Sequence, residues 1–152
     1  MDVRMLVSSN LEETQMLKDC RVFTTLPVTD PDRARAFYAE KLGLTPTAPG
    51  GDFYECGAGT RFVISKMSAK AAGHTQMGFV VEDVAATVKE LRARGLVFEE
   101  YDWPTLKTVD SVFDNGELKS AWFKDSEGNT IGIMQPVEEG FRIAAGAAVA
   151  GR

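Results

Sequence analysis

The sequence contains one pattern of elements twice, and this repeat limits the folds that the chain can adopt. In each copy an apolar, β-rich run precedes a helical pattern that begins at an aspartate, Asp30 or Asp83, and ends at a glycine, Gly43 or Gly95. Aspartate is a favoured helix N-cap, and glycine readily takes the left-handed backbone that ends a helix. One copy alone would leave a face of its sheet uncovered. The repeat therefore predicts two modules that fold together.

Each helical pattern is followed by strand-like runs that form a hairpin. In the first copy, residues 52–56 and 61–67 flank a Gly-Ala-Gly turn, and in the second, residues 117–125 and 129–136 flank a Ser-Glu-Gly turn. Residues 96–104 form a further predicted strand. These runs predict an α+β fold of two tandem βαβββ modules.

Two stretches lie outside the repeat, residues 1–20 and 137–152. The first lacks the apolar centre of a signal peptide, and no apolar run in the chain approaches the roughly 20 residues that cross a bilayer. The formal charge of −5 would repel nucleic-acid phosphates. We expect a cytoplasmic protein with no nucleic-acid or membrane partner. It would have an N-terminal extension at 1–20, one domain at 21–136 (modules near 21–68 and 73–136) and a flexible tail at 137–152.

Alternation along the strands separates a helix-facing side from an opposite, inward side. The helix-facing set is expected to be Leu26, Val28, Met77, Phe79, Val81, Ile131 and Ile133. Aligning the run GTRFVIS with GNTIGI makes Val63 the counterpart of Gly132. The inward set is then Phe23, Thr25, Pro27, Val63, Gln76, Gly78, Val80, Thr130, Gly132 and Met134. Within it, Phe23, Val63, Gln76 and Gly132 occupy equivalent positions on the first and last strands of the two modules.

Three segments carry a resemblance to a known family: LPVTDPDRARAFYAEKLGL (26–44), GFVVEDVAATVKELRARGL (78–96) and AWFKDSEGNTIGI (121–133). They resemble the vicinal oxygen chelate superfamily, which includes glyoxalase I, extradiol dioxygenases, fosfomycin-resistance enzymes and bleomycin-binding proteins. The resemblance covers about residues 21–136. It implies paired modules whose strands curve into half-barrel sheets, forming an open cup around a ligand cavity. In metal-dependent members, the first strand of each module supplies a His or Gln and the last strand a Glu or similar residue, all on inward positions.

The four matching positions of this chain are poor metal ligands. Of Phe23, Val63, Gln76 and Gly132, only Gln76 can ligate a cation, and a lone amide oxygen is a poor site for a divalent ion. Gly132 is expected to leave open space where a carboxylate would reach into the cup. The chain has one histidine, His74, so it cannot by itself supply two or three histidines to a metal. We predict an apolar cup with no metal and no cofactor.

Other catalytic chemistry has little support in the sequence. No G-x-S-x-G elbow, P-loop or dinucleotide fingerprint is present. Gln76 cannot act as a base because an amide does not titrate, and Thr25 could only orient a ligand. Cys20 and Cys56 are expected to be reduced thiols. Tyr54 and Cys56 share one face of a strand, where they either line the first cup or belong to the core.

Two tryptophans are further candidates for the site. Trp103 precedes a loop expected near the mouth of the cup, and Trp103 and Trp122 could form aromatic walls for a small organic ligand. The alternative is that one or both fill the core or a dimer seam. Lys107 and Asp110 either address a charged group of a substrate or are ordinary surface charges.

Three functions remain open from the sequence. The first is a homodimeric, metal-independent protein that binds an apolar or aromatic small molecule, similar to the bleomycin-binding group. The second is a glyoxalase-like lyase or isomerase acting on a small keto compound, and the third is an interaction module with filled cups. We favour the first and predict no catalytic residue. The predicted ligand-binding residues are Phe23, Thr25, Val63, Gln76, Gly78, Trp103, Trp122, Gly132 and Met134.

Overall fold

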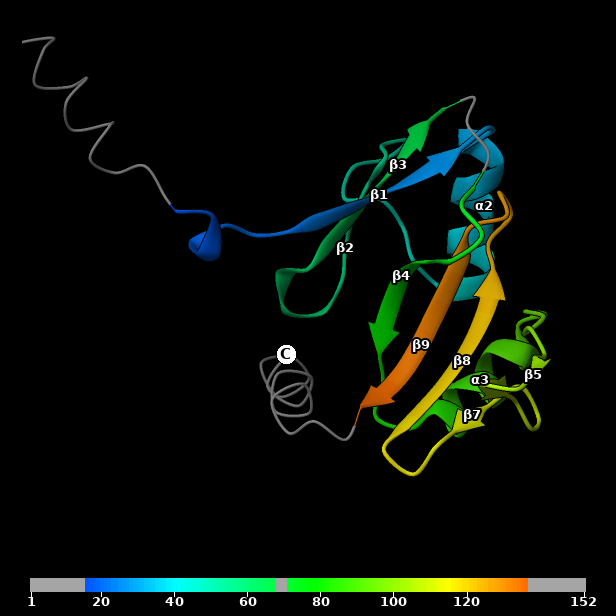
Figure 1. The fold of residues 1–152 in the computed structure, drawn as a ribbon. Helices are drawn as coiled ribbons and strands as arrows, with labels where there is room; N and C mark the ends of the chain where they lie inside the picture. Colours follow the sequence, from blue (N-terminus) through cyan, green and yellow to red (C-terminus); the bar gives the residue numbers. More distant parts are fainter. Residues whose placement is uncertain (1–15, 68–70, 137–152) are drawn as a thin grey trace, which may run out of the picture.

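The computed structural model describes residues 16–67 and 71–136, which form two main sheets, each backed by a helix, and a small two-stranded sheet (Figure 1). It confirms the predicted α+β fold of two βαβββ-type modules. The predicted tail at 137–152 lies outside the described residues, as does most of the predicted extension at 1–20. No helix in the described ranges is long and apolar enough to cross a membrane. In chain order the elements are η1 (Leu17–Asp19), β1 (Phe23–Val28), α2 (Pro31–Leu42), β2 (Phe53–Glu55), η2 (Gly57–Gly59), β3 (Arg61–Lys66), β4 (Thr75–Val80), α3 (Val84–Ala93), β5 (Asp102–Trp103), β6 (Leu106–Lys107), β7 (Phe113–Asp114), β8 (Leu118–Lys124) and β9 (Thr130–Pro136).

Both helices begin and end where the aspartate–glycine spacing predicts. A side-chain oxygen of Asp30 accepts a hydrogen bond from the third amide of α2 at 3.1 Å, and Asp83 does the same for α3 at 3.0 Å. Gly43 follows α2 with φ of 69°, and Gly95 lies two residues after α3 with φ of 86°. Each aspartate therefore satisfies an amide that a helix start leaves unpaired, and each glycine takes the left-handed conformation at little cost.

The first strands of the two modules lie at the adjoining edges of their sheets. One sheet has the order β1-β3-β2 and the other the order β4-β9-β8-β7. β1 runs parallel to β3, and β4 runs parallel to β9. β1 and β4 contact each other without forming a ladder, so the two modules meet along these edges.

The strand predicted over residues 96–104 is largely wrong. This stretch forms only an isolated bridge between Phe98 and Phe123, followed by the two-residue strand β5, which pairs with β6. Leu96 and Phe98 are buried while Val97 is 82% exposed. The alternation therefore reports correctly which side chains face the core. It does not require a neighbouring strand to pair with them.

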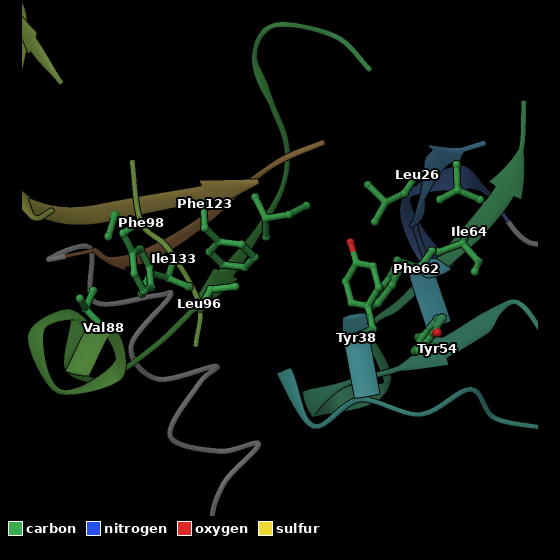
Figure 2. Packing of buried hydrophobic residues seen from close by; sticks show 14 of the residues in the cluster. Leu26, Tyr38, Tyr54, Phe62, Ile64, Val88, Leu96, Phe98, Phe123 and Ile133 are labelled. Carbon is green, nitrogen blue, oxygen red and sulfur yellow. The ribbon is translucent and has the colours of Figure 1, made fainter. Parts of the chain in front are cut away.

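The core consists of one group of buried side chains from each module (Figure 2). All seven residues of the predicted helix-facing set are buried or pack on this core. In the first module the ring of Tyr54 stacks on Phe62 with centroids 4.6 Å apart. Tyr54 is fully buried and is therefore a core residue rather than a wall of a cup.

The turn between β8 and β9, residues 125–129, connects the second module to the first, and we call it the junction turn. Oε1 of Glu127 accepts hydrogen bonds from the backbone amides of Thr29 at 3.0 Å and Asp30 at 2.8 Å, just before α2. Its Oε2 accepts a hydrogen bond from Nε of Arg33 at 2.7 Å. The Glu127 side chain is only 1% exposed. Burial opposes its ionisation, but the hydrogen bonds from Arg33 and the Asp30 amide outweigh burial and lower the pKa of Glu127 to about 2.

Two further side chains of the junction turn reach the first module. The hydroxyl of Tyr38 in α2 donates to Oδ2 of Asp125 at 2.8 Å. Nδ2 of Asn129 donates to the carbonyl oxygen of Pro27 in β1 at 2.9 Å. Burial and the neighbouring Asp125 carboxylate raise the pKa of Tyr38, so its hydroxyl stays protonated and remains a donor. The junction turn thus fixes both α2 and β1 to the second sheet.

The lowered pKa of Glu127 predicts a specific loss of stability in acid. A carboxylate with a depressed pKa stabilises the fold above its ordinary pKa of 4.5, and that stability is lost as the pH falls towards 2. The difference corresponds to about 3 kcal/mol at neutral pH. Urea unfolding measured from pH 7 to pH 2 should therefore show that Glu127→Gln lowers the free energy of unfolding at pH 7.

The same variant should also flatten the pH dependence between 4.5 and 2. Glu40→Gln, an exposed substitution on α2, is the matched control and should behave like the wild type. If Glu127→Gln kept the acid dependence of the wild type, the ionised Glu127 would not hold the modules together.

Candidate functional site

A groove lies between the ends of β1 and β4, where the two modules meet. Its volume is about 620 Å³, within the range of roughly 300–1,000 Å³ that is common for small-molecule sites. The start of β1, the η2 turn, the start of β3 and residues 77–80 of β4 line it. Two predicted ligand-binding residues, Phe23 and Gly78, belong to this lining.

Phe23 presents its ring to the groove because of its place in β1. Leu26 and Val28 on the other side of the strand are buried in the core, whereas Phe23 is 59% exposed. It lies opposite Arg61 in the parallel ladder with β3. Removing such apolar surface from water is favourable at roughly 25 cal/mol per Å². Phe23 therefore offers a ligand a large apolar contact that the folded chain leaves open.

Gly78 lies together with two further predicted residues, Gly132 and Met134, on β4 and β9. Gly78 and Gly132 are direct partners in the parallel ladder. The terminal methyl of Met134 lies 3.5 Å from the position that a Cβ atom on Gly78 would take. Met134 therefore lies beside Gly78, which remains exposed, and its flexible side chain can adjust to a neighbouring ligand.

The expected open space at Gly132 is filled. Trp122 is the direct antiparallel partner of Gly132, and a Cβ atom on Gly132 would lie 3.4 Å from Cδ1 and Nε1 of the Trp122 indole. Gly132 is consequently buried. Directly paired residues on one face of a sheet are close neighbours, so the large ring rests over the residue that has no side chain. Gly132 accommodates tryptophan instead of enlarging the cup.

A β-bulge changes the expected side-chain alternation at Gln76. Thr75 pairs with Thr130 and Met77 pairs with Ile131, so Gln76 is an extra residue without a partner in the ladder. The methyl group of Thr75 lies 3.5 Å from the Cβ position of Gly132. A bulge redirects the side chains around it, which simple alternation does not anticipate. Gln76 is half-buried and does not line the groove.

The two tryptophans belong to a row of aromatic rings on the second module. The ring centroid of Tyr101 lies 4.7 Å from Trp103 and 5.6 Å from Trp122, and Phe113 lies 6.4 Å from Trp122. Trp103 is 57% exposed. Sequence reasoning did not select Tyr101 or Phe113 as candidates. Tyr101 lies two residues before Trp103, so strand alternation would have placed both rings on the same face and could have identified Tyr101.

The remaining predicted positions of the first module do not line the groove. Thr25 and Val63 are direct partners in the ladder between β1 and β3, and Val63 also pairs with Phe53 of β2. Thr25 is exposed and Val63 is half-buried. They lie on the side of the sheet opposite Leu26 and Ile64.

The groove contains few groups that titrate. Among its lining residues these are Cys56 and Arg61. Burial, and then the neighbouring carboxylate of Glu55, raise the pKa of the Cys56 thiol. Cys56 also packs against the core, so it contributes to both the core and the groove wall. A thiol with a raised pKa is a weak nucleophile and a weak base at neutral pH.

The other charged candidates lie outside the groove. His74 is exposed, and its Nδ1 lies 3.1 Å from the carbonyl oxygen of Thr75. Lys107 and Asp102 form an exposed ion pair of 3.8 Å, and Asp110 occupies a tight turn with φ of 50°. Within residues 16–67 and 71–136 no three His, Cys, Asp or Glu side chains gather as a metal site would require.

The protein thus belongs to a class of α+β proteins in which two βαβββ-type modules pair and meet beside an apolar groove. The chain belongs to the Glyoxalase/Bleomycin resistance protein/Dioxygenase superfamily, whose profile matches residues 22–133. This match confirms the family resemblance. Comparison with curated proteins gives no significant match.

Solved structures of other proteins share the fold. TnmS3, an antibiotic binding protein from Streptomyces sp. CB03234, is 23% identical, with 80% of this chain and 99% of that chain covered and a TM-score of 0.58. UcmS2 is 20% identical, with coverage of 80% and 98% and a TM-score of 0.58. A glyoxalase / bleomycin resistance protein from Catenulispora Acidiphila is 24% identical, with coverage of 77% and 98% and a TM-score of 0.53. At these identities the similarity establishes the fold alone.

The packing of Trp122 over Gly132 predicts that a small side chain at position 132 has little effect on stability and that a large one is destabilising. Gly132→Ala places a methyl group at ordinary contact distance, so stability should change by less than about 1 kcal/mol. Gly132→Leu must displace the indole and should cost about 1–3 kcal/mol. In a Trp103→Phe background, where Trp122 is the remaining tryptophan, Gly132→Leu should also shift the emission to longer wavelength. Unchanged emission and stability in Gly132→Leu would contradict this packing.

Proposed function

We propose that the protein binds an apolar or aromatic small molecule without a metal, in the groove between its two modules. The observation that carries the proposal is the lining of that groove. It combines the exposed ring of Phe23 with Met77, Phe79 and Val80 of β4, and none of the described residues that line it is acidic. Small-molecule sites are mostly apolar with a few polar groups that orient the ligand, which fits this lining.

The proposed independence from metal rests on side-chain chemistry. In metal-dependent relatives the ligands would stand at positions occupied here by Phe23, Val63, Gln76 and Gly132. Phe23 and Val63 have no donor atom, and Gly132 lies beneath Trp122. Gln76 alone offers a single neutral oxygen, which holds a divalent cation weakly.

The groove supports binding better than catalysis. A glyoxalase-like lyase or isomerase needs a group that moves a proton at the substrate. Cys56 and Arg61 are the titratable side chains of the lining, and the raised pKa of Cys56 keeps its thiol protonated at neutral pH. The third function, an interaction module with filled cups, agrees with Trp122 over Gly132 but not with the open groove beside Phe23.

One further observation supports the proposal in a general way. TnmS3, which shares the fold, is described as an antibiotic binding protein. The row of rings from Trp103 to Phe113 lies outside the lining of the groove, so it adds no support for a ligand there. We also propose a homodimer, because Met16, Leu17 and Val22 expose 67%, 87% and 84% of their surface ahead of β1.

The proposal predicts that Phe23 contributes directly to affinity. In a titration of the full chain with the flat, neutral probe 1-aminoanthracene, monitored by fluorescence, binding should saturate in the presence of a chelator. Phe23→Ala should weaken binding about tenfold, because the ligand no longer covers the ring.

Phe53→Ala is the matched control for this experiment. Phe53 is 51% exposed on β2 but does not line the groove, so its loss should leave the affinity unchanged. Equal affinities of Phe23→Ala and the wild type would place the binding site elsewhere. The absence of saturable binding in the wild type would contradict the proposed function.

A further inference from the structure

A second, smaller cavity adjoins the groove at its end nearest the start of β1. Its volume is about 230 Å³, and it shares Val22, Phe23 and Arg61 with the lining of the groove. The residues that it adds are Arg21 and Gly59. The apolar groove therefore leads at this end to two arginine side chains.

The guanidinium group of Arg21 is available to a ligand. In the described part of the chain Arg21 forms no ion pair and no side-chain hydrogen bond. Its Nη1 lies 3.6 Å from the position that a Cβ atom on Gly59 would take. Gly59 has φ of 73°, a conformation that glycine adopts without strain, and the absence of a side chain there keeps the space beside Arg21 open.

Arg61 forms an ion pair with Glu55, whereas the positive charge of Arg21 at the same end of the groove is not compensated by any described residue. Nη2 of Arg61 lies 3.2 Å from Oε1 of Glu55, and both side chains are about half exposed, at 45% and 44%. Glu55 can balance one of the two guanidinium groups. Among the described residues, neither cavity has an acidic side chain in its lining. The cavity end is therefore locally cationic, although the whole chain carries a formal charge of −5.

We propose that the ligand of the groove is an apolar carboxylic acid whose carboxylate pairs with Arg21. This inference rests on the proposed function and specifies its ligand class. The carboxylate would lie in the small cavity, where the planar guanidinium of Arg21 can donate two parallel hydrogen bonds to it. The apolar body would extend past Phe23 along residues 77–80 of β4, a strand segment about 10 Å long at roughly 3.3 Å per residue.

A monoanion fits this arrangement because one guanidinium lacks a partner. Burying a carboxylate in the apolar part of the groove would be costly, so the charge has to lie at the arginine end. This fixes the direction of the ligand in the groove. An uncharged molecule with the same apolar body would retain the contacts with Phe23 but leave Arg21 without a partner.

The test compares decanoate with decanol, which has the same number of carbon atoms and no charge. Both are titrated into the full chain by calorimetry at pH 7.5, below the concentration at which decanoate forms micelles. Decanoate should bind about tenfold more tightly than decanol, as expected for one charge-assisted pair. Arg21→Gln should remove this preference by weakening decanoate alone.

Lys66→Gln is the matched control, because it removes one positive charge from the first module at an exposed residue that lines neither cavity. It should keep the preference for decanoate. If wild type bound both compounds equally, or if Arg21→Gln kept the preference, the assigned role of Arg21 would be wrong while the groove would still bind apolar ligands. If neither compound bound while 1-aminoanthracene still bound, the proposed ligand class would be wrong and the groove would remain a site for aromatic molecules. If none of the three compounds bound, the proposed function would be wrong as well.

Discussion

The buried carboxylate of Glu127 is the interaction on which the arrangement of the two modules depends. It accepts hydrogen bonds from two backbone amides and from the Arg33 side chain at the start of α2. Asn129 of the same turn donates a hydrogen bond to the backbone of β1. Removing the hydrogen-bond partners of a buried carboxylate is costly because the charge is then left uncompensated. The junction turn therefore holds the edge of the first sheet against the edge of the second, and the groove exists only while these two edges adjoin.

The groove and the filled position at Gly132 show two different uses of apolar residues on one fold. On the second sheet, Trp122 covers Gly132, so that part of the face is packed. At the meeting of β1 and β4, Phe23 remains 59% exposed and no ladder closes the gap. Binding energy at such a site comes from apolar contact and from a few polar groups at its ends, rather than from coordination to a cation. This distinction underlies the proposal of a binding protein.

Much of the fold could be predicted from local signals, because those signals have local causes. Asp30 and Gly43 mark the ends of α2 through capping chemistry, and alternation separates buried Leu26 from exposed Phe23. The features that were missed depend on tertiary neighbours. The bulge at Gln76 and the ring of Trp122 over Gly132 follow from how β4 and β8 align with β9. The sequence DSEGN alone indicates only a turn, since the partners of Glu127 in the first module are more than 90 residues away along the chain.

The most direct test of the account is the metal content of the folded protein. The full chain would be incubated separately with Zn²⁺, Ni²⁺, Mn²⁺ and Fe²⁺, desalted and analysed by mass spectrometry. No metal should remain in stoichiometric amount, because Phe23, Val63 and Gly132 provide no ligating side chains. About one tightly held metal ion per chain would contradict this prediction and would require a site that involves Gln76 and His74 in a different arrangement.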